Sequence, residues 1–422
     1  MSNMQEANYD CIVIGGGPAG ATCATILAQH KRRVLVLEKS RFPRHHIGES
    51  LMPHTYATFE RLGMLKKLEA TDFPRKQSVQ FVNATGADSQ PFYFPRWRNH
   101  PSSTTWQVPR GEFDQMMLDN AREHGAEAIE GVKVNRVLFD GERAVGVSVT
   151  IDGELKELFA PVIVDATGES AILSRQLGIR SGDPKLKNGA IYSYFKGAQR
   201  DEGENAGATI IIHMPDREGW FWYIPLPNDM ASVGVVAPPA YLFTGRGDDP
   251  QETMLEEIAR TPGIARRLEP ATQTGKTYVT SDFSQMSSSI AGDGWVLIGD
   301  AFGFLDPVYS SGVMLALKSG EYAADAIHAA LADGDVSGGR LGSFANEFVA
   351  GMQSLKNLVY TFYDREFSFG EFAKAHPQYK DHLIRLLIGD VFNDEVNEIF
   401  DALGKYVDLP FNNISSEKTA LT

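Results

Sequence analysis

The chain has 422 residues, of which 43% are hydrophobic and 22% charged, and a formal net charge of −14. Because this length exceeds what one hydrophobic core usually holds, it predicts two packed domains. The acidic surface disfavours nucleic acid and anionic membranes as partners. The two cysteines exclude a disulfide framework and a cysteine-based metal site, and no apolar run is long enough for a membrane span. We therefore expect a protein of the reducing cytoplasm without a bound metal.

Residues 10–38 predict a βαβ unit. A buried strand leads into the turn Gly15-x-Gly17-x-x-Gly20, a helix of small residues follows, and a second buried strand ends at Glu38. The first glycine permits the turn, the second lets the backbone approach a pyrophosphate, and the third allows close helix–strand packing. The helix N-terminus offers N–H groups to the phosphates, and Glu38 can accept hydrogen bonds from a ribose. This unit predicts dinucleotide binding but does not separate FAD from NAD.

The rest of the chain alternates between strand-rich and helical patterns. We expect short strands between 78 and 106, a helix over 111–124, and strands over 132–138, 144–151 and 162–165. Residues 188–236 are strand-rich and aromatic and predict a second sheet, followed by helix near 251–267. A buried strand at 295–300 and a long helix over 312–332 come next, and amphipathic helices dominate from 341 onward.

Three later segments resemble the FAD segments of the two-dinucleotide-binding-domain flavoproteins. They are residues 108–114 (VPRGEFD), 164–168 (VDATG) and 298–301 (IGDA). In that class the aspartate of the last segment, here Asp300, holds the ribityl chain. The next helix, here beginning near Gly312, points its positive N-terminus at the isoalloxazine. The resemblance implies FAD as the cofactor.

The fold class that follows is α/β (α+β), an FAD-binding two-dinucleotide-binding-domain fold with an inserted β-sheet substrate domain and a C-terminal helical region. We expect the FAD-binding domain to be discontinuous, the substrate domain to be inserted in two pieces, and the helical region to come last. The FAD-binding domain is expected over residues 1–75, 106–170 and 290–335. The substrate domain is expected over 76–105 and 171–289, and the helical region over 336–422. Because no second dinucleotide fingerprint follows, we expect a separate flavin reductase to supply reduced FAD.

Two segments narrow the reaction. Residues 219–225 (GWFWYIP) resemble the Trp-x-Trp-x-Ile-Pro segment of flavin-dependent halogenases, and residues 73–81 (FPRKQSVQF) place Lys76 where halogenases carry a lysine between flavin and substrate. Further likeness covers residues 42–53 (FPRHHIGESLMP), 306–313 (DPVYSSGV) and 386–392 (LLIGDVF). The chain thus resembles the flavin-dependent (FADH2) halogenases over most of its length.

One position separates the chain from the tryptophan halogenases. Those enzymes carry a glutamate immediately before their Ser-Thr-Gly, where this chain has Tyr309. That glutamate helps position tryptophan or remove its proton. Its absence favours the phenol/pyrrole type, with the aromatic substrate either free or tethered to an acyl or peptidyl carrier protein.

The resemblance implies a mechanism and a set of site residues. In halogenases a flavin hydroperoxide and a chloride or bromide ion give hypohalous acid, which travels through a protected passage to the lysine. Lys76 would capture or hold it, Trp220 and Trp222 would keep the organic substrate away from the flavin, and the backbone of Ser311 and Gly312 would bind the halide. The expected cofactor-binding residues are Gly15, Gly17, Ala19, Gly20, Glu38, Lys39, Glu49, Ser50, Arg110, Asp165, Gly168, Asp300 and Gly312.

Two alternatives stay open. A geranylgeranyl-reductase-like FAD-dependent oxidoreductase that reduces alkenes would share the fold, the Gly-Glu-Ser loop and a similar aromatic strand, and a non-catalytic flavin-binding protein would share the fold alone. A lysine at the start of a strand is usually exposed, and tryptophans that alternate on a strand are usually core. Lys76 together with Ile224-Pro225 favours the halogenase.

Overall fold

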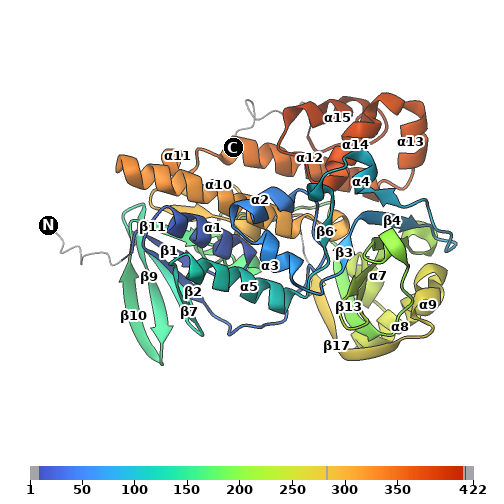
Figure 1. Ribbon diagram of the computed structural model, residues 1–422, viewed down its shortest axis with the longest axis horizontal. Helices are drawn as coiled ribbons and strands as arrows, with labels where there is room; N and C mark the ends of the chain where they lie inside the picture. The colour runs from blue at the N-terminus through green and yellow to red at the C-terminus, as the bar shows by residue number, and fades with distance from the viewer. Residues whose placement is uncertain (1–8, 282–283, 412–413, 415–422) are drawn as a thin grey trace.

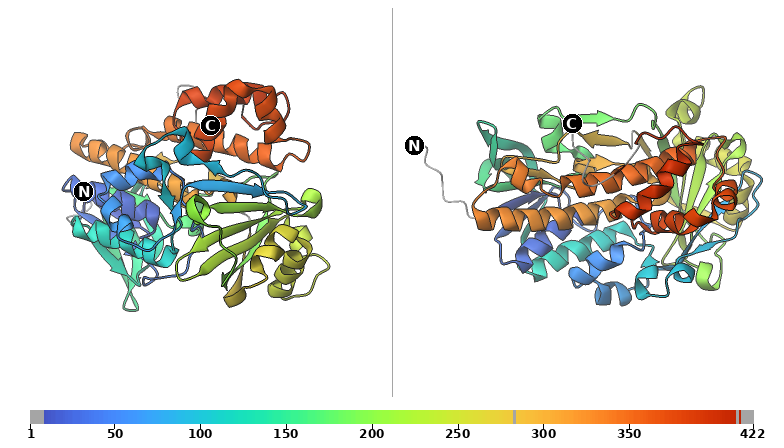
Figure 2. Two further views of the ribbon diagram at one scale, coloured as in Figure 1. Left: turned by 45° about the vertical axis from the view of Figure 1, so that its right-hand side comes forward. Right: turned by 90° about the horizontal axis from the view of Figure 1, so that it is seen from above.

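The structure is a computed structural model that describes residues 9–281, 284–411 and 414. A nucleotide-binding half and a sheet-rich half lie side by side, and C-terminal helices lie across their junction (Figure 1). The long helix α10 (Gly312–Asp333) runs lengthwise over the first half, and α12 (Ala345–Tyr363) continues toward the second, as the view from above shows (Figure 2).

The first half is built on a six-stranded sheet of order β19-β20-β11-β1-β2-β7. All neighbours in it are parallel except β19 and β20. Its central strands are short apolar runs buried on both faces, as parallel strands under helices must be. The bounds are β19 Ala291–Gly292, β20 Trp295–Leu297, β11 Val162–Asp165, β1 Cys11–Ile14, β2 Val34–Glu38 and β7 Glu127–Glu130.

Helix α1 (Pro18–Gln29) packs between α10 and α5 (Arg110–Glu123). Small residues make this packing close: a Cβ on Gly320 of α10 would lie 2.5 Å from the carbonyl oxygen of Ala19. An antiparallel sheet of order β10-β9-β8 flanks the nucleotide-binding sheet. Its strands are β8 Lys133–Asp140, β9 Arg143–Ile151 and β10 Glu154–Phe159.

The second half is a seven-stranded sheet of order β17-β13-β16-β15-β14-β4-β5. Its strands are β17 Thr272–Ser281, β13 Gly189–Lys196, β16 Met230–Ala237, β15 Trp220–Leu226, β14 Thr209–His213, β4 Ser78–Val82 and β5 Phe92–Tyr93. Side chains alternate along β15: Phe221 and Tyr223 join the core under α7–α9, whereas Trp220 and Trp222 join the core shared with the nucleotide-binding half. The helices on the far face are α7 Pro239–Phe243, α8 Pro250–Arg260 and α9 Pro262–Leu268.

Short elements complete the fold. The two-stranded sheet β3-β6 (Arg75–Lys76 and Thr105–Trp106) lies between the halves, and a three-stranded sheet has the order β12-β18-β21. Helix α14 packs on α4 and on α12. The remaining bounds are α2 Thr55–Arg61, α3 Leu65–Glu69, α4 Phe94–Trp97, α6 Ile172–Gln176, α11 Gly338–Leu341, α13 Phe369–Ala375, α14 Lys380–Ile388, α15 Glu398–Leu403, β12 Arg180–Gly182, β18 Gln285–Ser287 and β21 Gly303–Phe304.

The predicted fold class is confirmed, including the second sheet and the C-terminal helices. Strands β4 and β5 join the seven-stranded sheet. The expected division into domains stays a prediction. The sequence patterns missed β7 and β10 and the break between α8 and α9 at Thr261. No helix among the described residues is long and apolar enough to cross a membrane.

Candidate active site

A cavity of about 1100 Å³ runs from the glycine turn to the inner face of the seven-stranded sheet. It brings together residues from both halves of the molecule. The predicted cofactor-binding residues that line it are Gly15, Gly17, Ala19, Glu38, Lys39, Glu49, Ser50, Arg110, Gly168, Asp300 and Gly312, and both tryptophans, Trp220 and Trp222, line it as well.

The glycine turn forms one end of the cavity. A Cβ on Gly15 would lie 2.3 Å from the Ala166 carbonyl oxygen. A Cβ on Gly20 would lie 2.0 Å from the Gly15 carbonyl oxygen. Both glycines are therefore required for backbone packing. Gly17 differs, because a Cβ there would meet only the Arg44 guanidinium, at 3.4 Å, and the residue faces the cavity.

Glu38 supports this turn from the end of β2. Its carboxylate accepts hydrogen bonds from the backbone N–H of Gly16 and of Ser40, both at 2.8 Å. The side chain is buried yet lines the cavity, so it can hold the turn and meet a ribose hydroxyl at the same time. Lys39 beside it donates to the Ser170 hydroxyl at 3.0 Å.

Two arginines meet on the buried carboxylate of Asp114. Arg110 makes two hydrogen bonds to it, at 2.8 and 3.0 Å, and Arg44 forms an ion pair with it at 3.0 Å. Arg110 also donates to the Ile47 carbonyl at 2.7 Å and so fixes the loop over residues 42–53. Since Arg44 faces both the cavity and Gly17, it can neutralise a bound pyrophosphate. Sequence reasoning missed Arg44, although it stands in the loop that carried the resemblance.

Asp300 and the start of α10 form another part of the cavity wall. Asp300 lines the cavity, and its pKa is raised to about 7 by desolvation and by the nearby Glu169 carboxylate. Helix α10 begins at Gly312, as predicted, and Gly312 and Ser310 line the cavity. The positive helix end therefore points at this region.

Three predicted residues stand behind the cavity wall. Asp165 accepts hydrogen bonds from the N–H groups of Thr167 (3.0 Å) and Leu173 (2.8 Å), which makes it a brace for the 164–168 loop. Gly20 packs against the turn, and Ser311 is buried as the residue before α10. Their expected contacts with cofactor or halide stay predictions.

Lys76 faces a second, small cavity. This cavity is lined by Lys76, Val79, Phe81, Phe94, Thr209, Val308, Tyr309, Ser310 and Leu387. Thr209 and Ser310 line the large cavity too, so the two cavities adjoin. The position of Lys76 is fixed by the β3–β6 pairing and by Gly207, where a Cβ would lie 2.1 Å from the Arg75 carbonyl oxygen.

The Lys76 amine is buried without a carboxylate partner among the described residues. Its Nζ donates to the Ser50 hydroxyl at 2.8 Å and to the Leu51 carbonyl at 3.0 Å, and the Phe94 ring lies 5.9 Å away. Desolvation lowers the pKa of Lys76 to about 7. A substantial fraction of this amine is therefore neutral, and nucleophilic, near neutral pH.

This burial predicts a pH-dependent stability. Because the unfolded chain keeps the proton that folded Lys76 loses above about pH 7, the free energy of unfolding should rise with pH. Between pH 7.5 and 9 the unsubstituted protein should gain about 2 kcal/mol relative to Lys76→Met. Urea unfolding of both proteins across this range measures the difference. A difference that is constant with pH would show that Lys76 titrates normally.

Trp220 and Trp222 of β15 line the cavity, and Trp220 also contacts the C-terminal helix α12. Trp220 donates to the Tyr363 hydroxyl at 2.9 Å, and Tyr363 in turn donates to Asp306 at 2.8 Å. Trp222 donates to the Ser232 hydroxyl at 3.1 Å and packs on Gly234, where any Cβ would overlap the indole. Both rings are thus held in place rather than merely filling a core.

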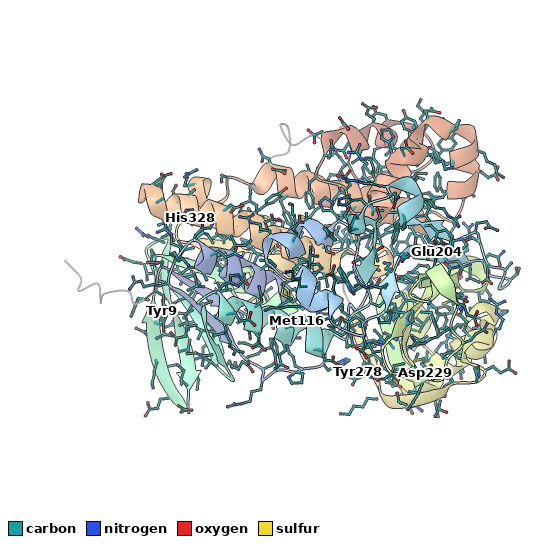
Figure 3. The ribbon with its side chains drawn as sticks, viewed as in Figure 1. Tyr9, Met116, Glu204, Asp229, Tyr278 and His328 are labelled. Atoms are coloured by element: carbon teal, nitrogen blue, oxygen red, sulfur yellow. The ribbon has the colours of Figure 1, made fainter. Side chains whose placement is uncertain are left out.

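An aromatic group beside the flavin-facing wall was not predicted. His45 lines the cavity, stacks on Tyr278 with ring centroids 4.2 Å apart, and shares a 3.2 Å hydrogen bond with Tyr192. Tyr278 lies on β17, where the seven-stranded sheet meets the nucleotide-binding half (Figure 3). Tyr194 donates to the buried Glu49 carboxyl at 2.8 Å, and burial raises the pKa of Glu49. Tyr192 and Tyr194 come from β13, whose sequence showed only a strand pattern.

FAD fits a cavity with these features: a glycine turn, two arginines, a glutamate that can meet a ribose, and a helix N-terminus in the wall. Comparison with known proteins agrees. The family model described as tryptophan halogenase matches residues 10–100 and 95–369. The chain belongs to the flavin-dependent halogenase family. It is an enzyme of this type and uses reduced FAD and a halide ion.

Two curated relatives match this halogenase along most of their length. One, from Pseudomonas fluorescens, is a 1H-pyrrole-2-carbonyl-[peptidyl-carrier protein] chlorinase, 30% identical over 96% of this chain and 94% of its own. The other, from Pseudoalteromonas luteoviolacea, is the corresponding brominase, 34% identical over 92% and 93%. The solved flavin-dependent brominase Bmp2 has a TM-score of 0.85 at 32% identity, over 94% of this chain and 98% of that one. These relatives fit the predicted phenol/pyrrole type and lend no support to the alkene-reductase alternative.

Proposed function

We propose that this halogenase places chlorine or bromine on a pyrrole ring tethered to a carrier protein, with Lys76 delivering the halogen. The position of Lys76 carries the proposal: a buried amine with a lowered pKa lies on a small cavity that adjoins the flavin cavity. Reduced FAD, when bound, would react with oxygen and halide to supply hypohalous acid. The protein must then confine that acid and present it to one ring.

The walls between the two cavities support the confinement. Trp220 and Trp222 are held by hydrogen bonds and occupy the flavin side, so an organic substrate has little access to the flavin there. Thr209 and Ser310 line both cavities and so form the boundary that hypohalous acid would cross. Lys76, beyond this boundary, can hydrogen-bond the acid or take the halogen as a haloamine.

The start of α10 is the proposed halide site. The backbone N–H groups of Ser311 and Gly312 stand at a helix N-terminus, where the helix dipole favours an anion. Gly312 lines the large cavity, which supports a halide site on that cavity.

The substrate class rests on the two full-length relatives and on Tyr309. The buried Tyr309 lines the Lys76 cavity, and burial raises the pKa of its phenol well above the usual value. It therefore stays neutral and cannot replace the glutamate that tryptophan halogenases carry here. An electron-rich pyrrole loses its ring proton readily and does not require that glutamate.

The test supplies the purified enzyme with FAD, a flavin reductase, NADH, oxygen and chloride or bromide. Three substrates are compared: pyrrole-2-carbonyl on a peptidyl carrier protein, free pyrrole-2-carboxylate and a simple phenol. We expect halogen isotope patterns on the carrier-bound pyrrole at a rate at least about 10-fold above the free acid, because tethering raises the effective concentration of the ring. Halogenation of the free compounds alone would contradict the carrier proposal.

The reductase is proposed as a separate partner, because the described fold carries one dinucleotide site. Leaving the reductase out of the mixture should abolish turnover with NADH, and chemically reduced FAD should restore it. Turnover with NADH and no reductase would contradict this part of the proposal.

A further inference from the structure

Lys76 and the flavin cavity are connected by two buried hydroxyl groups. Lys76 Nζ donates to Ser50 Oγ at 2.8 Å, and Ser50 Oγ lies 2.7 Å from Thr209 Oγ1. Lys76 lines the small cavity, Ser50 lines the large one, and Thr209 lines both. The pair therefore bridges the two cavities at the boundary where the halogen has to pass.

Gln107 fixes this pair in place. Its side-chain amide donates to Thr209 Oγ1 and to the Gly207 carbonyl, both at 2.9 Å, and its backbone bridges to Ser50 as an isolated antiparallel pair. The Ser50, Thr209 and Gln107 side chains are each at most 4% exposed. Such burial holds the hydroxyl oxygens at hydrogen-bonding distance without competition from bulk water.

Counting hydrogens shows that one hydroxyl hydrogen is left over. Lys76 and Gln107 both donate, so each occupies a lone pair on Ser50 or Thr209 and uses none of their hydrogens. The contact between Ser50 and Thr209 uses one of the two hydroxyl hydrogens. Either hydroxyl can be the donor in that contact, and in both cases the second hydrogen belongs to a hydroxyl that lines the large cavity.

We propose that Ser50 and Thr209 form a proton relay that carries a proton from Lys76 to the flavin cavity before the lysine takes up the halogen. This inference rests on the proposed role of Lys76. The nitrogen must first present a lone pair, so one N–H bond of the ammonium breaks. That proton passes to Ser50 as a hydroxyl proton leaves the far end of the pair for water in the large cavity.

The rest of the sequence balances without another reactant. The free amine attacks hypohalous acid, the oxygen–halogen bond breaks, an N–X bond forms and water leaves with the second amine proton. Transfer to the ring then exchanges the halogen for the ring proton and returns the neutral amine. The Leu51 carbonyl, the other acceptor of Lys76, cannot pass a proton on, so Ser50 is the one hydrogen-bond partner of Lys76 among the described residues that can.

Asp300 on the large cavity also has a pKa of about 7, but it is present in every variant and so does not create a difference between them. Tyr309 on the small cavity keeps its phenol proton because burial raises its pKa. Burial raises the pKa of Glu49, next to Ser50; its carboxyl accepts a hydrogen bond from Tyr194, and it too is present in every variant. The remaining residues on the small cavity are apolar or hydroxyl side chains.

The matched variants are Thr209→Val, which keeps the shape and removes the hydroxyl, and Thr209→Ser, which keeps the hydroxyl. Ser50→Ala interrupts the relay at its first member. The first measurement uses ¹⁵N-lysine-labelled protein without FAD and follows exchange of the Lys76 ammonium hydrogens with solvent, the signal being assigned by its loss in Lys76→Met. We expect exchange to slow at least about 10-fold in Ser50→Ala and by a smaller factor in Thr209→Val, because Ser50 itself lines the large cavity; exchange in Thr209→Ser should stay as in the unsubstituted protein.

The second measurement is the pH profile of product formation. At pH 6, where Lys76 is mostly protonated, Ser50→Ala with saturating reduced FAD should form product about 10-fold more slowly than the unsubstituted enzyme, and at pH 8.5 less than about 2-fold more slowly. Exchange in Ser50→Ala at the original rate, or an equal loss of product formation at both pH values, would overturn the relay. Halogenation retained in Lys76→Met would instead overturn the proposed role of Lys76. The exchange experiment does not depend on that role, so the two failures can be told apart.

Discussion

Replacing Lys76 with methionine is expected to lower the rate of product halogenation by about 1000-fold while FAD binding stays unchanged. Methionine fills a similar volume in the buried site between Phe94 and Ser50, but it offers neither a hydrogen-bond donor nor a nucleophilic nitrogen. Because Lys76 lies on the small cavity and not on the flavin cavity, the cofactor site should be intact. Mass spectrometry of the product and the absorption spectrum of bound FAD measure the two quantities.

A scavenger assay separates delivery from formation of the oxidant. If Lys76 acts after hypohalous acid has formed, the methionine variant should release the acid, and an added diketone scavenger should become halogenated. The exposed Lys66 is the matched control, because Lys66→Met removes a lysine outside both cavities and should leave product formation unchanged. Product formation by Lys76→Met at the original rate would exclude Lys76 from the reaction.

The nucleotide-binding half could be predicted from the sequence because the local residue patterns there indicate the same strands and helices that the long-range contacts stabilise. The strands β1, β2 and β11 are continuous apolar runs, and the glycine turn can form only one kind of junction between strand and helix. The strand β7, by contrast, is rich in glutamate and partly exposed, and β10 is nearly all exposed. Neither strand has the alternation that marks a half-buried strand, so no local signal reveals it.

The candidate site shows the same division. Residues in the FAD segments could be placed from the sequence, because each is tied to a glycine turn or to a strand end. Arg44 and Tyr363 could not, because each acts through a contact with a distant part of the chain: Arg44 with Asp114, and Tyr363 with Trp220. The pairing of Ser50 with Thr209 joins residues from two halves of the molecule, and no spacing in the sequence encodes it.

The structure also changes what the three fingerprint glycines are expected to do. Gly15 and Gly20 are restricted by neighbouring backbone, whereas Gly17 has room for a side chain and an extended conformation, with φ −70° and ψ −176°, that any residue adopts. A substitution at Gly17 should therefore leave the fold intact, and its effect should fall on the ligand.

Gly17→Val is expected to weaken FAD binding about 100-fold, or ~2.7 kcal/mol, with the free energy of unfolding of the FAD-free protein little changed. The valine side chain would project into the cavity where the backbone has to approach the pyrophosphate. Gly20→Ala should behave in the opposite way: its Cβ overlaps the Gly15 carbonyl, so the FAD-free protein should lose about 2 kcal/mol of stability. FAD titration and urea unfolding of both variants distinguish the two glycines. Equal loss of stability in both would show that Gly17 also serves the fold, and unchanged FAD affinity in Gly17→Val would place the pyrophosphate elsewhere in the cavity.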